Sequence, residues 1–219
     1  MHPSLTLKAL QESAQAFCQA ESVYPNPGLY GITDGKAIGT YIEHKFQQYL
    51  ESRYSYQRGS SAKGIDLPET GIMTDIKVTS IRQPQSSSPF KDAKQKIFGL
   101  GYHLLIFVYD KIDDPKAAVA KLDFVRCVFL DKTRTADYTT TFRLREMIKD
   151  GAIQEDIVAY LQDKNIPADE TTLHQIAEEI IKTPPQQGYL TISNALQWRL
   201  QYTRVVQLTE NIQGITKIV

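Results

Sequence analysis

The pattern of hydrophobic and polar positions predicts helices and strands along most of the chain. Between residues 36 and 54 apolar side chains recur at helical spacing and form one apolar face. A separate helix is expected at 5–21, because the Tyr-Pro-Asn-Pro-Gly cluster at 24–28 cannot continue a helix. At 72–79 apolar and polar residues alternate with period two, which predicts a strand.

Two continuous apolar runs, at 103–109 and 122–130, are typical of strands buried on both faces. Before the first run, Ser88 followed by Pro89 predicts the N-cap and first turn of a helix that ends near 99–101. A helix that connects two strands indicates a crossover unit. The sequence therefore predicts an α/β fold in which helices flank a sheet.

The last third of the chain adds three helices and a half-exposed strand, expected at 142–149, 152–162, 171–182 and 196–203. Asp169 is the expected N-cap of the third of these helices. With no repeat or low-complexity linker, we expect one domain over residues 1–219. Its catalytic core would span about 36–131 and a C-terminal extension about 141–219.

Composition supports a globular intracellular protein. The chain has 219 residues, 42% of them hydrophobic, which is enough to bury a sizeable core. Two cysteines are too few for a disulfide framework and point to a reducing compartment. We find neither a secretion signal nor an apolar run long enough to span a membrane. The expected location is cytoplasmic, without a membrane partner.

The formal net charge of zero, from 25 basic and 25 acidic residues, hides an uneven distribution. Residues 77–100 hold five Lys or Arg against one acid, whereas residues 150–181 hold eight acids against one Lys. The acidic segment fits a pair of solvated helices, and the basic one fits a surface that meets a polyanion. The distribution permits DNA binding but does not establish it.

The strand at 72–79 carries the candidate chemistry. Asp75 and Lys77 share one face of it, and Asp66 lies nine positions upstream. Two converging carboxylates suit Mg²⁺, and a neighbouring lysine can activate water or stabilise charge on phosphate. The chain has five acid-x-Lys triplets, but only this one lies on a strand with a second acid just upstream. This set of groups is what phosphodiester hydrolysis requires.

The segments 61–68 and 74–80 together resemble the PD-(D/E)xK nucleases, and more narrowly the type II restriction endonucleases. The family pattern is an Asp at the start of one strand, a short hairpin, and then acid-x-Lys on the next strand. Asp66 and Asp75 match the metal-binding acids, and Lys77 matches the lysine. The resemblance implies a restriction-endonuclease-like fold with a mixed central sheet flanked by helices.

The resemblance covers about residues 39–111 and implies further site residues. Glu43 matches a glutamate that family members carry on the preceding helix, and the backbone carbonyl of Ile76 would be a metal ligand. Glu69 competes as the second acid from a less suitable position. One departure is that Ile65, rather than the family's proline, precedes the first acid.

These matches imply a Mg²⁺-dependent enzyme that hydrolyses double-stranded DNA at a short specific sequence. A homodimer and a companion DNA methyltransferase would accompany it. Two alternatives stay open at this point. The chain could be another nuclease of the same superfamily, such as a repair or junction-resolving enzyme, or a DNA-binding protein that no longer cleaves.

The polar segment after the catalytic strand is the candidate DNA-reading element, because its groups can bond base edges and phosphates. Its serines are also expected at a helix N-terminus, which favours a phosphate. The candidate DNA-binding residues are Arg82, Gln83, Gln85, Ser86, Ser87, Ser88, Lys91 and Lys94.

Overall fold

The computed structural model describes residues 2–59, 64–89, 91–193 and 197–219. The chain divides into two compact units, each described here by itself. Unit 1 comprises Met1–Ser86, Tyr102–Asp131 and Val205–Val219, and unit 2 comprises Ser87–Gly101 and Lys132–Arg204. In the described part of the chain, no helix is both long enough and apolar enough to cross a membrane.

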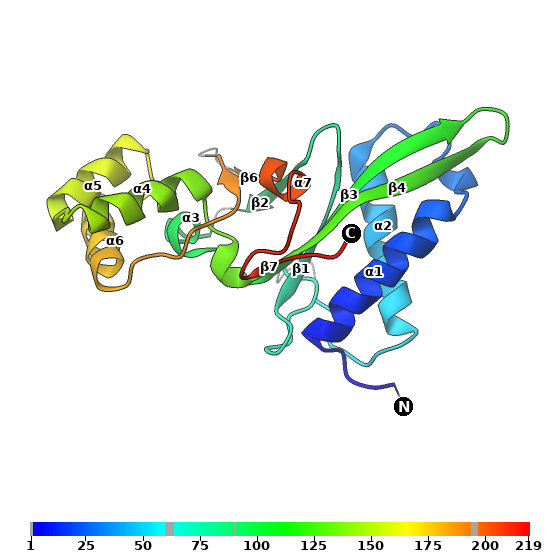
Figure 1. The fold of residues 1–219 in the computed structure, drawn as a ribbon, viewed down its shortest axis with the longest axis horizontal. Coiled ribbons are helices and arrows are strands. Elements are labelled where there is room, and N and C mark those ends of the chain that lie inside the picture. Colours follow the sequence, from blue (N-terminus) through cyan, green and yellow to red (C-terminus); the bar gives the residue numbers. More distant parts are fainter. Residues whose placement is uncertain (1, 60–63, 90, 194–196) are drawn as a thin grey trace. The chain divides into compact units, whose positions relative to one another are not determined.

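Unit 1 contains a four-stranded sheet in the order β1-β3-β4-β7 (Figure 1). The strands are β1 (Thr74–Ser80), β3 (His103–Asp114), β4 (Val119–Leu130) and β7 (Ile215–Lys217). β1 runs parallel to β3, whereas the β3–β4 and β4–β7 pairs are antiparallel. The sheet is therefore mixed, and all three strands expected before residue 131 are confirmed.

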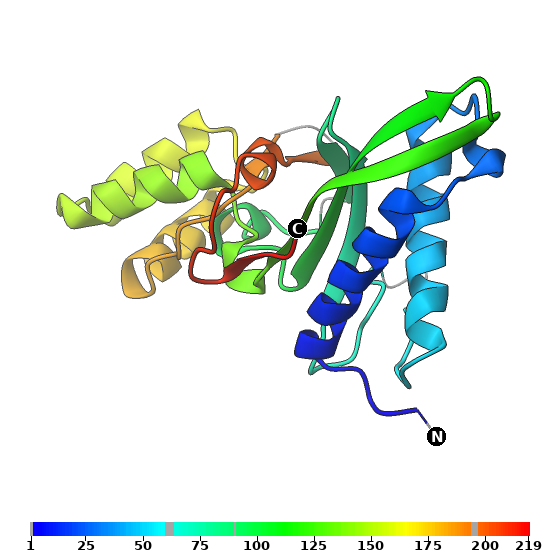
Figure 2. The ribbon, with the colours of Figure 1, turned by 45° about the vertical axis from the view of Figure 1, so that its right-hand side comes forward.

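Two long helices pack on the same side of this sheet, as both ribbon views show (Figures 1 and 2). α1 (Leu7–Val23) contacts β4, and α2 (Gly35–Glu51) contacts β1. The side chains of Thr6 and Asp34 cap their N-termini by accepting backbone N–H groups. This confirms the prediction of a mixed α/β fold in which helices flank the central sheet.

Aromatic rings form the centre of the core between the helices and the sheet. The ring centroids of Phe46 and Phe107 lie 5.0 Å apart, and those of Phe17 and Phe46 lie 5.1 Å apart. Phe124 on β4 completes the cluster at 5.9 Å from both Phe17 and Phe107. The cluster joins α1, α2, β3 and β4, so it fixes both helices against the two central strands of the sheet.

Unit 2 consists of helices and a small three-stranded sheet in the order β2-β6-β5. Its helices are α3 (Gln95–Phe98), α4 (Tyr138–Lys149), α5 (Gln154–Asp163) and α6 (Glu170–Lys182). The strands of this sheet are β2 (Gln85–Pro89), β5 (Thr191–Ile192) and β6 (Gln197–Gln201), and the short α7 (Thr203–Val206) follows β6. The first two residues of β2 and the last two of α7 belong to unit 1. The three helices expected after residue 141 are confirmed, and Asp169 caps α6 as predicted.

The prediction of a helix that starts at Ser88 and Pro89 is wrong. These residues end strand β2, and the only helix between β2 and β3 in the described residues is the four-residue α3. The reason is a long-range partner, because β2 is hydrogen-bonded beside β6, more than a hundred residues further along the chain. A local Ser-Pro signal contains no information about that pairing.

The aromatic cluster leads to a prediction about stability. Phe107→Ala is expected to lower the free energy of unfolding by about 3–5 kcal/mol, because Phe107 is fully buried and the cavity cannot fill. Ile112→Ala, on the same strand but 55% exposed, should cost below about 1 kcal/mol. Urea unfolding followed by far-ultraviolet circular dichroism measures both, and equal losses would contradict this account of the core.

Candidate active site

A hairpin places Asp66 beside the first strand. Leu67 and Thr74 exchange two backbone hydrogen bonds of 3.0 Å, and the turn between them closes on the carbonyl of Glu69. The side chain of Glu69 accepts the backbone N–H of Gln57, so it stabilises a loop instead of competing as a second acid. The short hairpin expected from the family pattern is therefore present.

Asp66 is fixed to the free edge of β1. Its Oδ2 accepts the backbone N–H of Ile76 at 2.7 Å, on the side of β1 that is not paired with β3. Because the N–H and C=O of a strand residue point to the same side, the Ile76 carbonyl faces this edge too. One carboxylate and one carbonyl oxygen are thus brought to the same edge of the sheet.

Asp75 and Lys77 form a close ion pair next to Asp66. Lys77 Nζ lies 2.7 Å from Asp75 Oδ2, yet this buried oxygen accepts no hydrogen bond of regular geometry. Asp75 is only 4% exposed. Burial, assisted by the neighbouring carboxylate of Asp66, raises the pKa of Asp75 to about 7, although Lys77 opposes the rise.

Glu43 approaches the same point from helix α2. Burial is the main cause of its raised pKa, and the charge of Asp66 adds to it, whereas His44 and Lys77 lower it. The structure thus brings Asp66, Asp75 and Lys77 together at β1, and Glu43 lies on α2, the helix that contacts β1.

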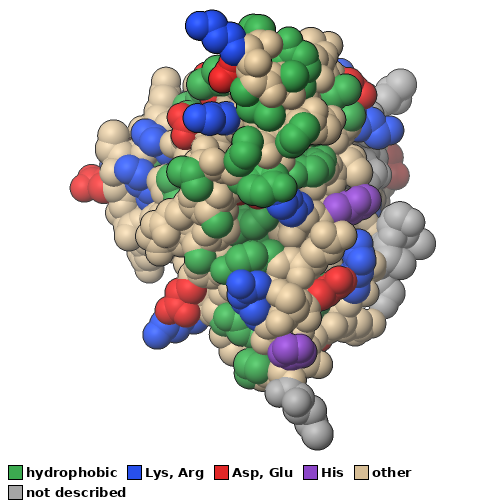
Figure 3. Space-filling model, turned by 90° about the vertical axis from the view of Figure 1, so that its right-hand side faces the viewer, with side chains coloured by type: hydrophobic (Ala, Val, Ile, Leu, Met, Phe, Trp, Pro, Cys, Tyr) green, Lys and Arg blue, Asp and Glu red, His purple; other side chains and the backbone are tan. Residues whose placement is uncertain are grey.

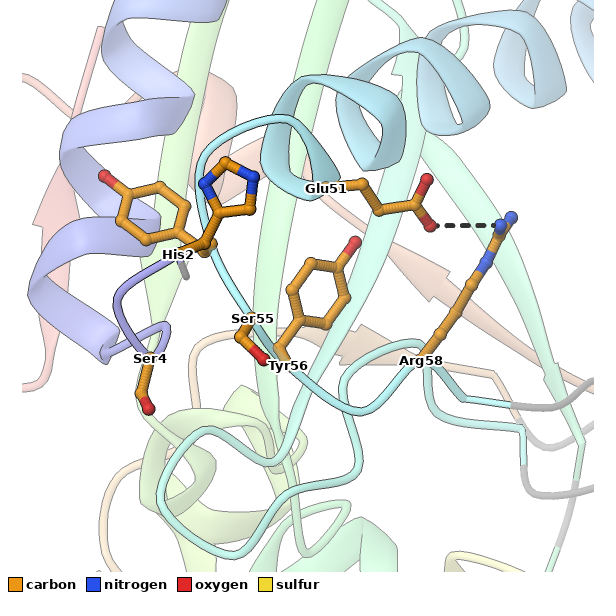
Figure 4. A pocket seen from close by; sticks show the side chains of 7 residues that line it. His2, Ser4, Glu51, Ser55, Tyr56 and Arg58 are labelled. Atoms are coloured by element: carbon orange, nitrogen blue, oxygen red, sulfur yellow. Dashed lines mark hydrogen bonds and ion pairs between the residues drawn. The ribbon is translucent and has the colours of Figure 1, made fainter.

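A hydrogen-bonded chain links Glu43 to a neighbouring loop. The buried Gln47, one turn further along α2, donates to Glu43 Oε1 at 3.4 Å and accepts from Arg58 Nη2 at 2.5 Å. Arg58 also pairs with Glu51 at 3.3 Å, at the wall of an open cavity of about 510 Å³ (Figure 4). Sequence reasoning missed Gln47 and Arg58, although the spacing of Gln47 from Glu43 was a usable signal.

The next residue, Gly59, holds the other acid in place. Its N–H donates to the carbonyl of Asp66 at 2.7 Å. A Cβ at this position would lie 1.9 Å from the carbonyl oxygen of Ile65 and 2.9 Å from that of Asp66, closer than any real contact. Arg58 therefore restrains Glu43 through Gln47, and the next residue, Gly59, restrains Asp66.

The chemistry of the donors fits a hard divalent cation. Asp75 Oδ2 is a buried carboxylate oxygen that accepts no hydrogen bond of regular geometry, although Lys77 Nζ lies 2.7 Å away, and a second carboxylate and a carbonyl oxygen accompany it. Among the described residues no group of three or more acidic, His or Cys side chains is placed as one ligand set. The candidate ligands are therefore Asp66, Asp75 and the Ile76 carbonyl, with Glu43 adjacent to them.

The predicted DNA-binding residues of unit 1 lie at the far end of β1. Arg82 is exposed and its Nε lies 3.7 Å from Asp110. Gln83 and Gln85 have their backbones tied to the hydroxyl of Thr79, which organises the turn after β1. Gln83 lies in the turn that follows β1, and Gln85 is the first residue of β2.

The remaining predicted DNA-binding residues differ in their surroundings. Ser88 is 2% exposed in β2, and with no helix starting there the expected phosphate site at a helix N-terminus is absent from the described segment. Ser87 and Lys91 are exposed, and Ser86 is half-buried. Lys94 Nζ pairs with Glu179 at 2.5 Å, so an acid of the same unit already compensates its charge.

Comparison with known proteins decides the family. A family model described as "Type II restriction enzyme NspV" matches residues 4–217. The chain belongs to this family. It is 51% identical over 214 residues to the type II restriction enzyme NspV of Nostoc sp. (strain ATCC 29411 / PCC 7524), covering 98% of this chain and 96% of that protein. No solved structure matches the chain.

Membership of the NspV family confirms the prediction of a site-specific type II restriction endonuclease. The match extends far beyond residues 39–111, which carried the resemblance, and spans all of unit 2. It gives no support to a repair or junction-resolving nuclease, or to a protein that only binds DNA.

The buried Asp75 leads to a prediction about pH. Because its pKa rises from 3.8 to about 7 on folding, the folded state binds an extra proton and is favoured at low pH. This contribution to stability is fully present below about pH 4 and is lost as the pH rises through 7. Without metal, Asp75→Asn should therefore unfold at a higher temperature than the parent above pH 7, and the difference should shrink at pH 4–5.

Thermal unfolding in EDTA across pH 4–8.5 measures this difference, with the exposed Asp123→Asn on β4 as control. Addition of Mg²⁺ should stabilise the parent and the Asp123→Asn protein, but not Asp75→Asn. Parallel curves for the parent and Asp75→Asn at every pH would show that burial of Asp75 carries no cost.

Proposed function

We propose that this enzyme hydrolyses phosphodiester bonds of double-stranded DNA with Mg²⁺, using Asp66, Asp75, Lys77 and Glu43. The single observation that carries the proposal is the buried Asp75–Lys77 pair beside Asp66, which is fixed to the free edge of β1. Two acids can bind the metal ion, and the lysine beside them can orient the attacking water and stabilise negative charge on the phosphate.

Each residue has a part that follows from its position. Asp66, Asp75 and the Ile76 carbonyl would hold the cation, which lowers the pKa of water and offsets charge on the phosphate. Lys77 Nζ, 2.7 Å from Asp75, orients the attacking water and stabilises the negative charge that develops as the phosphorus–oxygen bond breaks. Glu43 assists from α2 by accepting a hydrogen bond from that water or holding a second cation.

Sequence specificity requires contacts to bases, and the exposed turn after β1 is the proposed reader in unit 1. Arg82 and Gln83 line an open cavity of about 580 Å³ with Ser80 and Lys111. Their donors and acceptors are of the kind that reads base edges in the major groove. The other predicted residues stay in the proposed DNA-binding set, namely Gln85, Ser86, Ser87, Ser88, Lys91 and Lys94. The case for Ser88 is weaker because it is buried, and the case for Lys94 is weaker because it is ion-paired.

A homodimer is the second part of the proposed function, because a two-fold symmetric protein matches a two-fold symmetric DNA site. In support, unit 1 exposes large apolar side chains, namely Val23, Tyr24, Tyr30, Ile32 and Ile112. Apolar side chains gather on the face of the molecule seen in Figure 3. A companion DNA methyltransferase would protect the host DNA at the same sequence.

Cleavage of phage DNA tests the proposed chemistry. With Mg²⁺ the parent should give discrete fragments, and with EDTA none. Asp75→Ala and Lys77→Ala should each lower the cleavage rate by at least about 100-fold, because each removes a group that acts on water or phosphate.

The matched controls are Lys116→Ala, from an exposed acid-x-Lys triplet, and the exposed Asp123→Ala. Both should cut like the parent. Full cleavage by Asp75→Ala or Lys77→Ala would show that the site lies elsewhere, and a smear instead of bands would argue against sequence specificity.

A further inference from the structure

Helix α4 of unit 2 presents an unusual surface. Tyr138, Phe142, Arg145 and Lys149 follow one another at spacings of four, three and four residues, so they form one stripe along the helix. Phe142 is 50% exposed, and Arg145 and Lys149 are exposed as well. The opposite side carries the fully buried Leu144, which packs in the core of unit 2. The stripe is therefore an outer face of aromatic and basic groups, and the half-buried Glu146 is the acid that neighbours it on the helix.

Planar groups stack at the start of this stripe. The rings of Tyr138 and Phe142 are nearly parallel, with an interplanar angle of 5° and centroids 6.2 Å apart. The guanidinium of Arg204 lies 3.9 Å from the centre of the Tyr138 ring and is fixed by a 2.8 Å hydrogen bond to the hydroxyl of Thr191. The stack thus begins with an oriented cation and ends with an exposed ring.

The arginines around the stack lack compensating acids. In the described part of unit 2, no carboxylate lies within ion-pair distance of Arg134, Arg145 or Arg204. The Nε of Arg134 is buried and has no hydrogen-bond partner. Burial lowers the pKa of Arg134, and the nearby positive charge of Arg145 lowers it further. An anion at this point would satisfy the Nε and offset the repulsion.

The rest of unit 2 has the opposite charge. The acids on α5 and α6 include Glu155, Asp156, Glu170, Glu178 and Glu179. On α6, Glu179 pairs with Lys94 and Glu178 pairs with Lys182. α4 carries Arg143, Arg145 and Lys149 against the single acid Glu146, whereas acids outnumber basic residues on α5 and α6. A polyanion would meet attraction on one side of this unit and repulsion on the other.

We propose that the α4 face, defined as Arg134, Tyr138, Phe142, Arg145, Lys149 and Arg204, binds the sugar-phosphate backbone of DNA. Uncompensated arginines supply the phosphate contacts, and the exposed aromatic rings pack against sugars. The proposal rests on the DNA substrate of the proposed function but not on its catalytic residues. It adds a DNA contact on α4, where none of the predicted DNA-binding residues lies.

Salt dependence of DNA binding tests this face. The affinity for a fluorescent duplex is measured in EDTA between 50 and 250 mM KCl, so that no cleavage takes part. Arg145→Gln and Lys149→Gln should each reduce the slope of log K against log [KCl] by about 0.9, the value for one lost phosphate contact. The matched control is Arg143→Gln, which removes the same charge from an exposed position two residues away, on a different side of α4.

The α4 face is supported if Arg145→Gln and Lys149→Gln lower the slope and Arg143→Gln keeps the parent's slope. It is overturned if all three variants share one slope, because the charge would then act without regard to position. Arg145→Gln loses a hydrogen bond to the Pro185 carbonyl and could unfold for that reason. In that case the slope of Lys149→Gln alone decides between support and contradiction, because Lys149 has the smaller structural role.

A photo-reactive phenylalanine in place of Phe142 provides an independent test. It should cross-link to the duplex, whereas the same group at the exposed Ile153 at the start of α5 should not. Equal cross-linking from both positions would contradict the proposal. Failure of the catalytic assignment would appear instead as cleavage by the Asp75 or Lys77 variants, with binding by the α4 face unaffected.

Discussion

The arrangement of the candidate site depends on one backbone hydrogen bond, from the N–H of Ile76 to the carboxylate of Asp66. β1 is the outermost strand of its sheet, and its free edge has N–H and C=O groups to satisfy. Asp66 uses that edge, and it can do so only because the Leu67–Thr74 bridge turns the chain back alongside β1. The same bond brings one carboxylate close to another, and so creates the electrostatic cost that a cation would remove.

Elements with a strong local signal could be predicted from the sequence. α2 and α6 have long apolar stripes and capping acids, and β1 alternates with period two, so their positions required no knowledge of distant residues. The Asp66, Asp75 and Lys77 set could be proposed because the period-two strand puts Asp75 and Lys77 on one face and the family resemblance adds a hairpin that returns Asp66 alongside it. The family resemblance added Glu43, which helix periodicity alone leaves at the edge of an apolar face.

Features that depend on distant partners could not be predicted. The Ser-rich segment has the residues of a helix cap, but β6 makes it a strand. Lys94 lies in the most basic segment, yet Glu179, 85 positions away, offsets its charge. The reverse holds for Arg134, Arg145 and Arg204, which are scattered along the sequence and come together only in the fold of unit 2. Net charge by segment is therefore a poor guide to which cations are available to DNA.

The surroundings of Gly59 limit which residue can occupy that position. Its backbone donates to Asp66, and the space that a side chain would need is filled by the carbonyls of Ile65 and Asp66. The requirement is steric crowding and not an unusual backbone angle, so no other residue type escapes it. Any sequence that keeps the first acid at the edge of β1 in this way must leave position 59 without a side chain. Position 59 is thus tied to the candidate site through its backbone alone.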